Sequence, residues 1–182
     1  MKKAVLTLAV AVVVLAIAQA AQRNRVQAQQ SSAAGGLFPN DFGPASIDVS
    51  SYPKEYQETY KVFLTKCSVC HTIARPINSQ FLEISETQQA EMKKTQPELF
   101  TDPKILQIDP HIWSRYVHRM MDKPGCPVGK DGKRIWQFLV YDSIARKTGK
   151  NFAAWQKSRE KLLQDFKAQH SARYKELFDE KN

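Results

Sequence analysis

The sequence predicts an all-α protein, because three kinds of local signal recur along the chain. Apolar residues return at the three- and four-residue spacing of a helix face in several separate segments. Residues that favour helix N-termini, such as Asp109 and Asp131, stand just before those segments. Proline and glycine separate the segments, for example at Pro76 and Gly149. We therefore expect helices joined by turns, in about one domain's length of chain.

The N-terminal segment has the pattern of a secretory signal peptide. Two lysines at residues 2–3 precede an apolar run over residues 4–18, and the small residues of Ala18-Gln19-Ala20 supply a cleavage site. We predict a signal peptide over 1–20, with a second candidate cut after Ala28; the alternative is an uncleaved membrane anchor. The protein is therefore expected in the periplasm or another compartment outside the cytoplasm, and an uncleaved N-terminus would attach it to the membrane.

Residues 21–50 are rich in Gln, Ser, Ala, Gly and Pro and carry few aliphatic residues. This composition is typical of a flexible linker. We expect the folded domain over 51–148 and a helical extension over 149–182.

The first helix of that domain is predicted to begin near Pro53, because proline is tolerated in the first turn of a helix. Its apolar face consists of residues at helical spacing, namely Tyr56, Tyr60, Phe63 and Leu64. The helix leads directly into Cys67.

The pentapeptide Cys67-Ser68-Val69-Cys70-His71 has the CxxCH spacing at which c-type haem is attached. Two thiols on one helical turn can each add across a vinyl group of the same porphyrin, and the adjacent imidazole can then bind the iron. The alternatives are a redox-active cysteine pair or half of a zinc site. The chain has no second Cys or His pair at ligand spacing and no βαβ pattern around the motif. The sequence thus predicts one covalent haem c, held by Cys67, Cys70 and His71. The break at Arg75-Pro76 suggests that a backbone carbonyl there or later orients the imidazole.

Residues 77–108 are predicted to form a peripheral insertion. Ser85 and Gln88 fit a capping box for a short polar helix through about Lys94, and Pro97 and Pro103 interrupt the chain after it. We expect a solvated surface segment, with a partner-docking or haem-shielding loop as the alternative.

The next helix carries the candidates for the second axial ligand. Asp109-Pro110 can start it, and its apolar face consists of Trp113, Tyr116, Val117 and Met120. At about 100° per residue, Met120 lies roughly 20° from Trp113, Met121 roughly 80° and His118 roughly 140°. We predict Met120 as the ligand; His118 and Met121 are the alternatives, and the competing interpretation makes Met120 an ordinary core residue.

The remaining histidines and the third cysteine have simpler interpretations. His111 and His170 are expected at the surface. Cys126 follows in a turn-rich loop, and a lone cysteine usually behaves as a small apolar residue. Thiolate ligation by Cys126 is the alternative, and it would require a specially tuned site.

Two further helices complete the expected fold. Asp131 is predicted to cap a helix through about Lys147, which buries Ile135, Phe138 and Leu139. Asn151 can cap a last amphipathic helix that reaches about residue 179. That helix either folds back on the domain or binds a partner or membrane surface.

Over about residues 52 to 147 the chain resembles the class I cytochromes c. The similarity consists of Phe63 four residues before Cys67, the CxxCH motif, a later methionine and the aromatic-leucine pair Phe138-Leu139. The run from Trp113 to Met120 is similar to a Trp-x3-Val-x-Arg-Met segment of one branch of that family, in which the methionine is the distal ligand. The chain departs from many members in having Thr59 in place of a glycine at a helix crossing, and in its long insertion. The resemblance implies a class I cytochrome c-like helical fold.

Together these features predict an electron-transfer protein rather than an enzyme. An iron with histidine and methionine ligands has no open site for a substrate and passes single electrons. The net charge is +9 for the whole chain and +7 without residues 1–20, so acidic redox partner proteins are expected and nucleic acid is not. The alternatives are a haem subunit of a larger oxidoreductase or electron-conduit complex, in which the protein is oligomeric or complexed, and a gas-binding or peroxide-active haem protein.

Overall fold

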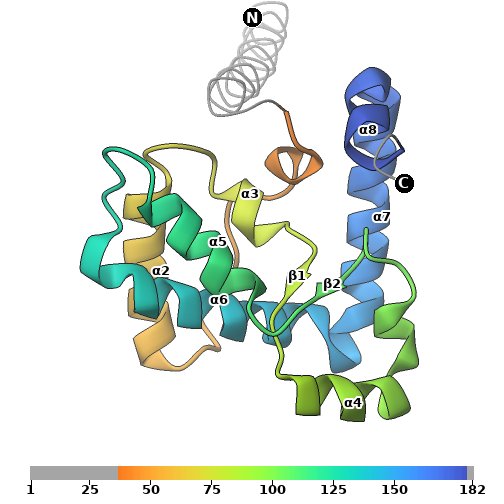
Figure 1. Cartoon of the computed structure of the whole chain (residues 1–182), viewed down its shortest axis with the longest axis horizontal. Coiled ribbons are helices and arrows are strands. Elements are labelled where there is room, and N and C mark those ends of the chain that lie inside the picture. The colour runs from red at the N-terminus through yellow and green to blue at the C-terminus, as the bar shows by residue number, and fades with distance from the viewer. Residues whose placement is uncertain (1–36, 180–182) are drawn as a thin grey trace, which may run out of the picture.

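A computed structural model describes residues 37–179, and Figure 1 shows that this part of the chain is mostly helical, as predicted. The helices are α2 (Lys54–Cys67), α3 (Ala74–Ile77), α4 (Glu86–Thr95), α5 (Ile112–Met121), α6 (Gly132–Lys147), α7 (Phe152–Gln169) and α8 (Ser171–Phe178). Short 3₁₀ turns are η1 (Pro39–Phe42), η2 (Pro97–Phe100), η3 (Gly129–Asp131) and η4 (Gly149–Asn151). The predicted signal peptide lies outside the described residues. Among the helices of residues 37–179, none is both long and apolar enough to span a membrane.

Two short strands are the exception to the helical fold. β1 (Phe81–Leu82) and β2 (Gln107–Ile108) pair in parallel, with Phe81 opposite Gln107. The pair closes the excursion that contains α4 and η2, so the predicted insertion begins and ends at one place.

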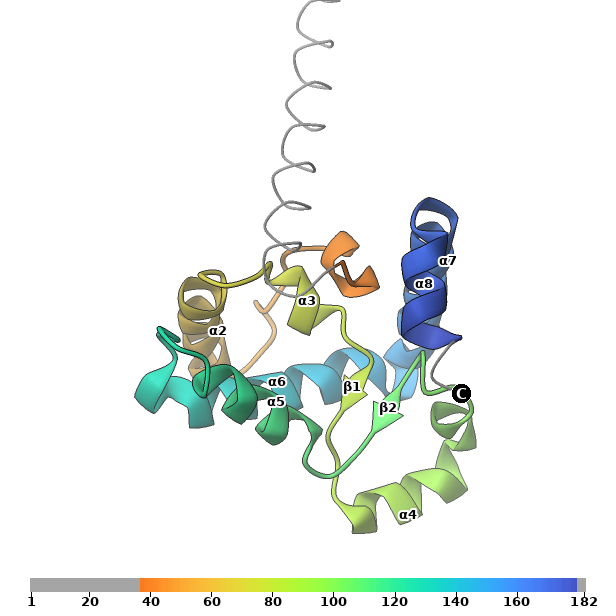
Figure 2. The ribbon, with the colours of Figure 1, turned by 45° about the horizontal axis from the view of Figure 1, so that its top comes forward.

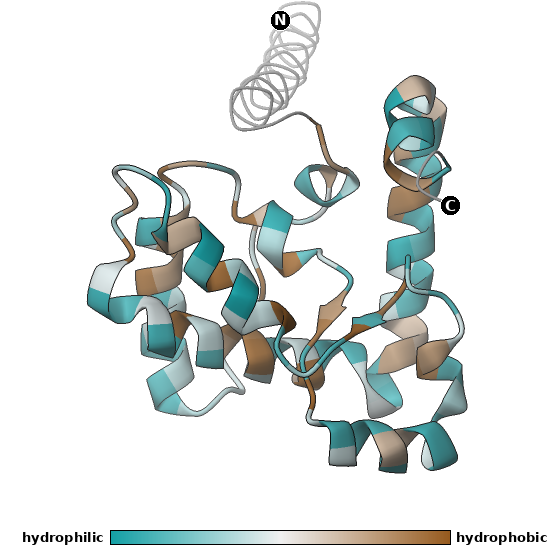
Figure 3. Ribbon diagram, in the orientation of Figure 1, coloured by the Kyte–Doolittle hydropathy of each residue, from teal (hydrophilic) through white to brown (hydrophobic). Residues whose placement is uncertain are grey.

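The first core lies between α2, α3, α5 and α6. Phe63, Trp113, Ile135 and Phe138 are each at most 1% exposed there. The helices α2 and α5 both pack on α6, as Figures 1 and 2 show. In Figure 3 these helices change between hydrophobic and hydrophilic colours along their length, as expected for helices with one buried face.

A second core joins the insertion to the C-terminal helices. Leu82 and Leu99 from the insertion pack with Trp155, Leu163 and Phe166 of α7. The last helix therefore folds back on the chain, and the insertion is only partly a solvated segment. The expected single helix is divided at His170 into α7 and α8.

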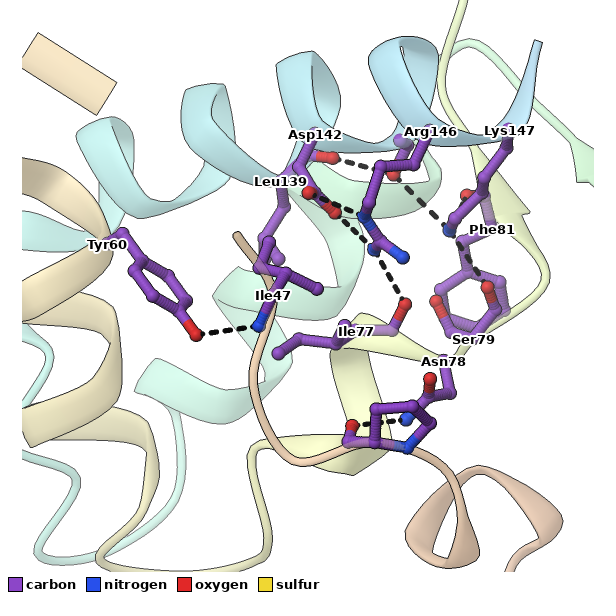
Figure 4. A network of polar contacts seen from close by, with 12 residues as sticks. Ile47, Tyr60, Ile77, Asn78, Ser79, Phe81, Leu139, Asp142, Arg146 and Lys147 are labelled. Atoms are coloured by element: carbon purple, nitrogen blue, oxygen red, sulfur yellow. Dashed lines mark hydrogen bonds and ion pairs between the residues drawn. The ribbon is translucent and has the colours of Figure 1, made fainter. Parts of the chain in front are cut away.

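Helix α6 connects the two cores. Its N-terminal part contributes Ile135, Phe138 and Leu139 to the first core. The Nζ atom of its last residue, Lys147, lies 4.8 Å from the centre of the Trp155 ring in the second core. The Lys147 ammonium is fully buried and donates to the carbonyls of Ser79 and Phe81, each at 2.8 Å (Figure 4). The same helix thus fixes the chain just before β1 and at the first residue of β1.

Several local expectations differ from the structure. Residues 37–50, expected in the linker, are packed: Asp41 of η1 is buried, and the Ile47 amide donates to the Tyr60 hydroxyl at 3.1 Å. Asp131 makes no capping hydrogen bond to α6, because its carboxylate pairs with Lys66 and Arg134 at 2.5 and 2.7 Å. The Ser85–Gln88 capping box is present as predicted.

Candidate functional site

The CxxCH motif begins at the last residue of α2. Cys67 is half-buried, and the turn that follows exposes Cys70 and leaves Val69 66% exposed. The end of α2 is fixed by Lys66, whose ammonium donates to the Pro127 carbonyl at 2.9 Å and pairs with Asp131. Cys67 thus closes α2 and Cys70 lies in the turn that follows, three residues later, the spacing at which two thiols can attach to one porphyrin.

The His71 imidazole is oriented by its own chain. Its Nδ1 lies 3.0 Å from the Thr72 carbonyl oxygen, and because a carbonyl only accepts, Nδ1 carries the proton. The sequence predicts an orienting carbonyl at Arg75-Pro76 or later. The structure places it at Thr72 instead. Burial lowers the pKa of His71. The neutral ring keeps its Nε2 lone pair available for a metal.

The loop after His71 is held by a buried ion pair with η1. The Asp41 carboxylate accepts from the Thr72 hydroxyl at 3.0 Å and from two nitrogens of Arg75 at 2.9 and 2.7 Å. A bidentate pair of this kind fixes direction as well as distance. Asp41, which the sequence places in a linker, thus holds the loop that follows the candidate ligand His71.

Met120 faces the same cavity as the motif. This cavity is apolar, and Cys67, Cys70 and His71 line it together with Met120. Its walls also include Phe63 and Leu139. The four residues predicted to hold haem thus line a single cavity, although they come from α2, the following turn and α5.

The alternatives to Met120 point elsewhere. His118 and Met121 line a different hollow, beside Gly132 and Trp136. The Nδ1 of His118 lies 2.7 Å from the Ser114 carbonyl oxygen. The sulfur of Met121 packs against Gly132 so closely that a Cβ atom on residue 132 would clash with it. Because of helical periodicity, α5 directs Met120 to the apolar cavity and directs His118 and Met121 to a different one.

Glu83 positions α5, although sequence reasoning did not select it. Its Oε2 accepts from the backbone amides of Trp113 and Ser114 at 2.6 and 3.1 Å, and its Oε1 accepts from the Trp136 indole at 2.8 Å. A carboxylate at this place satisfies the free amides of the first helical turn. Asp109, the expected cap, instead accepts from the His111 amide and pairs with Arg115.

A wider, more polar cavity adjoins the apolar one. It measures about 740 Å³ and shares Cys70, His71 and Met120 with the apolar cavity. Its polar lining includes Arg75, Arg119, Arg159, Asn40, Ser79 and Gln80. The site thus combines apolar walls with a cationic end, which suits a large apolar ring that carries acidic groups.

Cys126 also lines the apolar cavity. Burial raises the pKa of Cys67 to about 12, with smaller contributions from Cys126 and Cys70. Within residues 37–179, no group of three or more His, Cys, Asp or Glu residues is arranged to hold a metal ion. His111 and His170 line neither cavity, and the His170 ring packs 5.1 Å from the rings of Phe42 and Phe166.

The chain matches no known family model, no curated protein and no solved structure.

Proposed function

We propose that the chain is an exported monohaem c-type cytochrome that transfers single electrons between redox partners. The observation that carries this is the shared cavity: both thiols of a CxxCH motif, a histidine with a free Nε2 and Met120 line it together. The Ser79 hydroxyl, which lines the polar cavity and makes no hydrogen bond within residues 37–179, also fits a cofactor with acidic side groups.

In this proposal each residue has a defined role. Cys67 and Cys70 would hold a haem through two thioether bonds, and His71 and Met120 would bind its iron. When bound, the haem supplies a one-electron iron couple, whose potential a methionine ligand raises. Phe63 and Leu139 exclude water from the apolar cavity, which favours a single stable coordination.

The exposed side of the motif is the proposed contact for partners. Val69, Cys70 and Lys123 are exposed there, and Lys123 also lines the apolar cavity. Cations around an exposed apolar contact favour acidic partner proteins and fast, salt-dependent encounter. Such a protein would act as a carrier in the periplasm or an equivalent compartment, or as a subunit of a larger oxidoreductase, and not as an enzyme by itself.

The test is expression of the full chain with a c-type haem maturation system. Mass spectrometry and the reduced pyridine spectrum report covalent attachment, which Cys67→Ala with Cys70→Ala should abolish. We expect the ferric protein to show the near-infrared methionine-to-iron charge-transfer band by magnetic circular dichroism.

Met120→Ala should remove that band, and the matched variant Met121→Ala should keep it, because Met121 packs on Gly132. A band that survives Met120→Ala would contradict the ligand assignment. A high-spin wild-type spectrum would instead favour gas binding or peroxide chemistry, and a low-spin spectrum without the band would favour His118 or Cys126.

A further inference from the structure

Arg159 of α7 lies at the wall of the polar cavity and is only 2% exposed. Its Nε donates to the Lys104 carbonyl at 3.0 Å, and its terminal nitrogens donate to the Asn78 carbonyl at 3.0 Å, to the Gln80 side-chain oxygen at 3.1 Å and to the Asn40 side-chain oxygen. All four acceptors are neutral. A guanidinium has five N–H donors, so one remains beyond these four.

This buried charge has no acidic hydrogen-bond partner among the described residues. Arg75, in the same cavity wall, differs because Asp41 binds it. Burial lowers the pKa of Arg159 to about 10, although the Asp102 carboxylate acts electrostatically in the opposite direction without a hydrogen bond to it, so the group is still a cation at neutral pH. A buried charge without a hydrogen-bonded acidic partner is costly, and a bound anion would compensate it.

A second group at the same cavity lacks a partner. Ser79 is 2% exposed, and its hydroxyl is the buried side-chain polar atom that makes no hydrogen bond within residues 37–179. Its backbone is fixed, since its carbonyl accepts from Lys147 (Figure 4). Ser79 and Arg159 both line the polar cavity, and Asn78, next to Ser79, is hydrogen-bonded to Arg159.

We propose that Arg159 and Ser79 together bind a carboxylate in the polar cavity, and that this carboxylate is a propionate of the covalently attached haem. The proposal rests on the proposed function. A carboxylate accepts from both a guanidinium and a hydroxyl, so it would satisfy both unpaired groups. Cys70, His71 and Met120 border the same cavity, so a haem fixed by the motif brings its carboxylates there without a separate binding step.

The consequence concerns the C-terminal helices. Arg159 comes from α7, which belongs to the second core and not to the helices that carry the haem ligands. In this arrangement the second core supplies part of the cofactor site, and haem attachment ties the two cores together through one ion pair.

The experiment uses the haem-loaded full chain and its Arg159→Gln and Ser79→Ala variants. The readouts are the propionate bending band in the resonance Raman spectrum and the reduction potential. We expect both variants to shift the band. Arg159→Gln should also move the ferrous–ferric equilibrium toward ferric by about tenfold, which is 59 mV for one electron, because it removes a cation near the iron.

Two variants of the same helix are the controls. Leu163→Ala damages the second core without touching the cavity, and Lys161→Gln removes an exposed cation that pairs with Asp165. Both should leave the propionate band unchanged. If Arg159→Gln folds too poorly to measure, Ser79→Ala and Arg159→Lys provide the same test, since Ser79→Ala removes only the unpaired hydroxyl.

An unshifted band in Ser79→Ala and in both Arg159 variants, with haem covalently bound, would overturn the proposal. Absence of covalent haem from the wild-type protein would instead overturn the proposed function. Titration with acetate separates the two sources of carboxylate. Acetate-dependent changes in the Arg159 side-chain NMR signals of the loaded protein would assign the site to a free carboxylate and overturn the propionate assignment.

Discussion

The two cores differ in how their sequences are arranged. The first core is built from α2, α5 and α6, whose buried residues follow helical spacing within each segment. The second core combines α7 and α8 with short pieces of a mostly irregular insertion, such as Leu82, Leu99 and Leu106. Regular periodicity thus marks the first core in the sequence, whereas the part of the second core that comes from the insertion follows no helical period.

The two cores also differ in chemistry. All four candidate haem-binding residues lie beside the first core, while the second contributes a buried cation at the end of the adjoining cavity. Under the proposed function, the first core would hold the redox centre and the second core would affect its surroundings. A matched substitution in each core tests whether only the first core affects the candidate haem site.

Phe138→Ala and Phe166→Ala form that pair, since the two rings are 0% and 2% exposed. Each should lower the free energy of unfolding by about 4 kcal/mol, because a large buried ring leaves a cavity. In the haem-loaded protein, Phe138→Ala should also weaken the methionine-to-iron band, since Phe138 packs on Phe63 at the cavity wall. Phe166→Ala should keep the band. Denaturant unfolding and the near-infrared spectrum measure the two effects, and equal loss of the band in both variants would contradict the division.

The same comparison explains which features could be predicted from the sequence. The helix ending at Cys67, the face that carries Met120 and the buried face of α6 follow from periodicity, and the structure contains all three. Cys67, Cys70, His71 and Met120 line one cavity, and their role in haem binding stays a prediction.

The features that were missed depend on distant partners. Glu83 caps a helix that begins 29 residues later, and Asp41 binds Arg75 from a segment with the composition of a linker. Arg159 stands among many exposed cations of an amphipathic helix, and only its position against Asn78 and Lys104 buries it. Composition and spacing report local preferences, so they do not identify single polar residues that act across the fold.

Glu83 allows a second test of the comparison between the two cores. It follows Leu82 of the second core, and its carboxylate binds backbone amides of α5 in the first core. Glu83→Ala should lower the free energy of unfolding by about 3 kcal/mol, since two backbone amides and one indole lose a charged acceptor. It should also loosen α5 and so broaden the methionine signals of Met120 in the NMR spectrum of the loaded protein. Glu91→Ala is the control, because Glu91 is exposed and lies 4.0 Å from Lys94. Similar losses in the two variants would show that the cap is unimportant.

Tyr52→Phe gives the smallest effect and tests the first core alone. The Tyr52 hydroxyl donates to Asp142 at 3.0 Å, and burial and that carboxylate raise the pKa of Tyr52 above its ordinary 10.0. The variant should lose about 1.5 kcal/mol at neutral pH, the contribution of a hydrogen bond to a charged group.

The pH dependence of the variant has a definite sign. Above pH 10 the unfolded chain releases the Tyr52 proton before the folded protein does, so the free energy of unfolding of the wild type falls as the pH rises. Tyr52→Phe removes this contribution, and its stability deficit should therefore shrink above pH 10. Cys67 and Tyr116 also have raised pKa values and affect both proteins alike, so the difference between them isolates Tyr52. Denaturant midpoints measured at several pH values from 7 to above 10 report that difference, and a constant deficit would mean that the hydroxyl titrates normally in the fold.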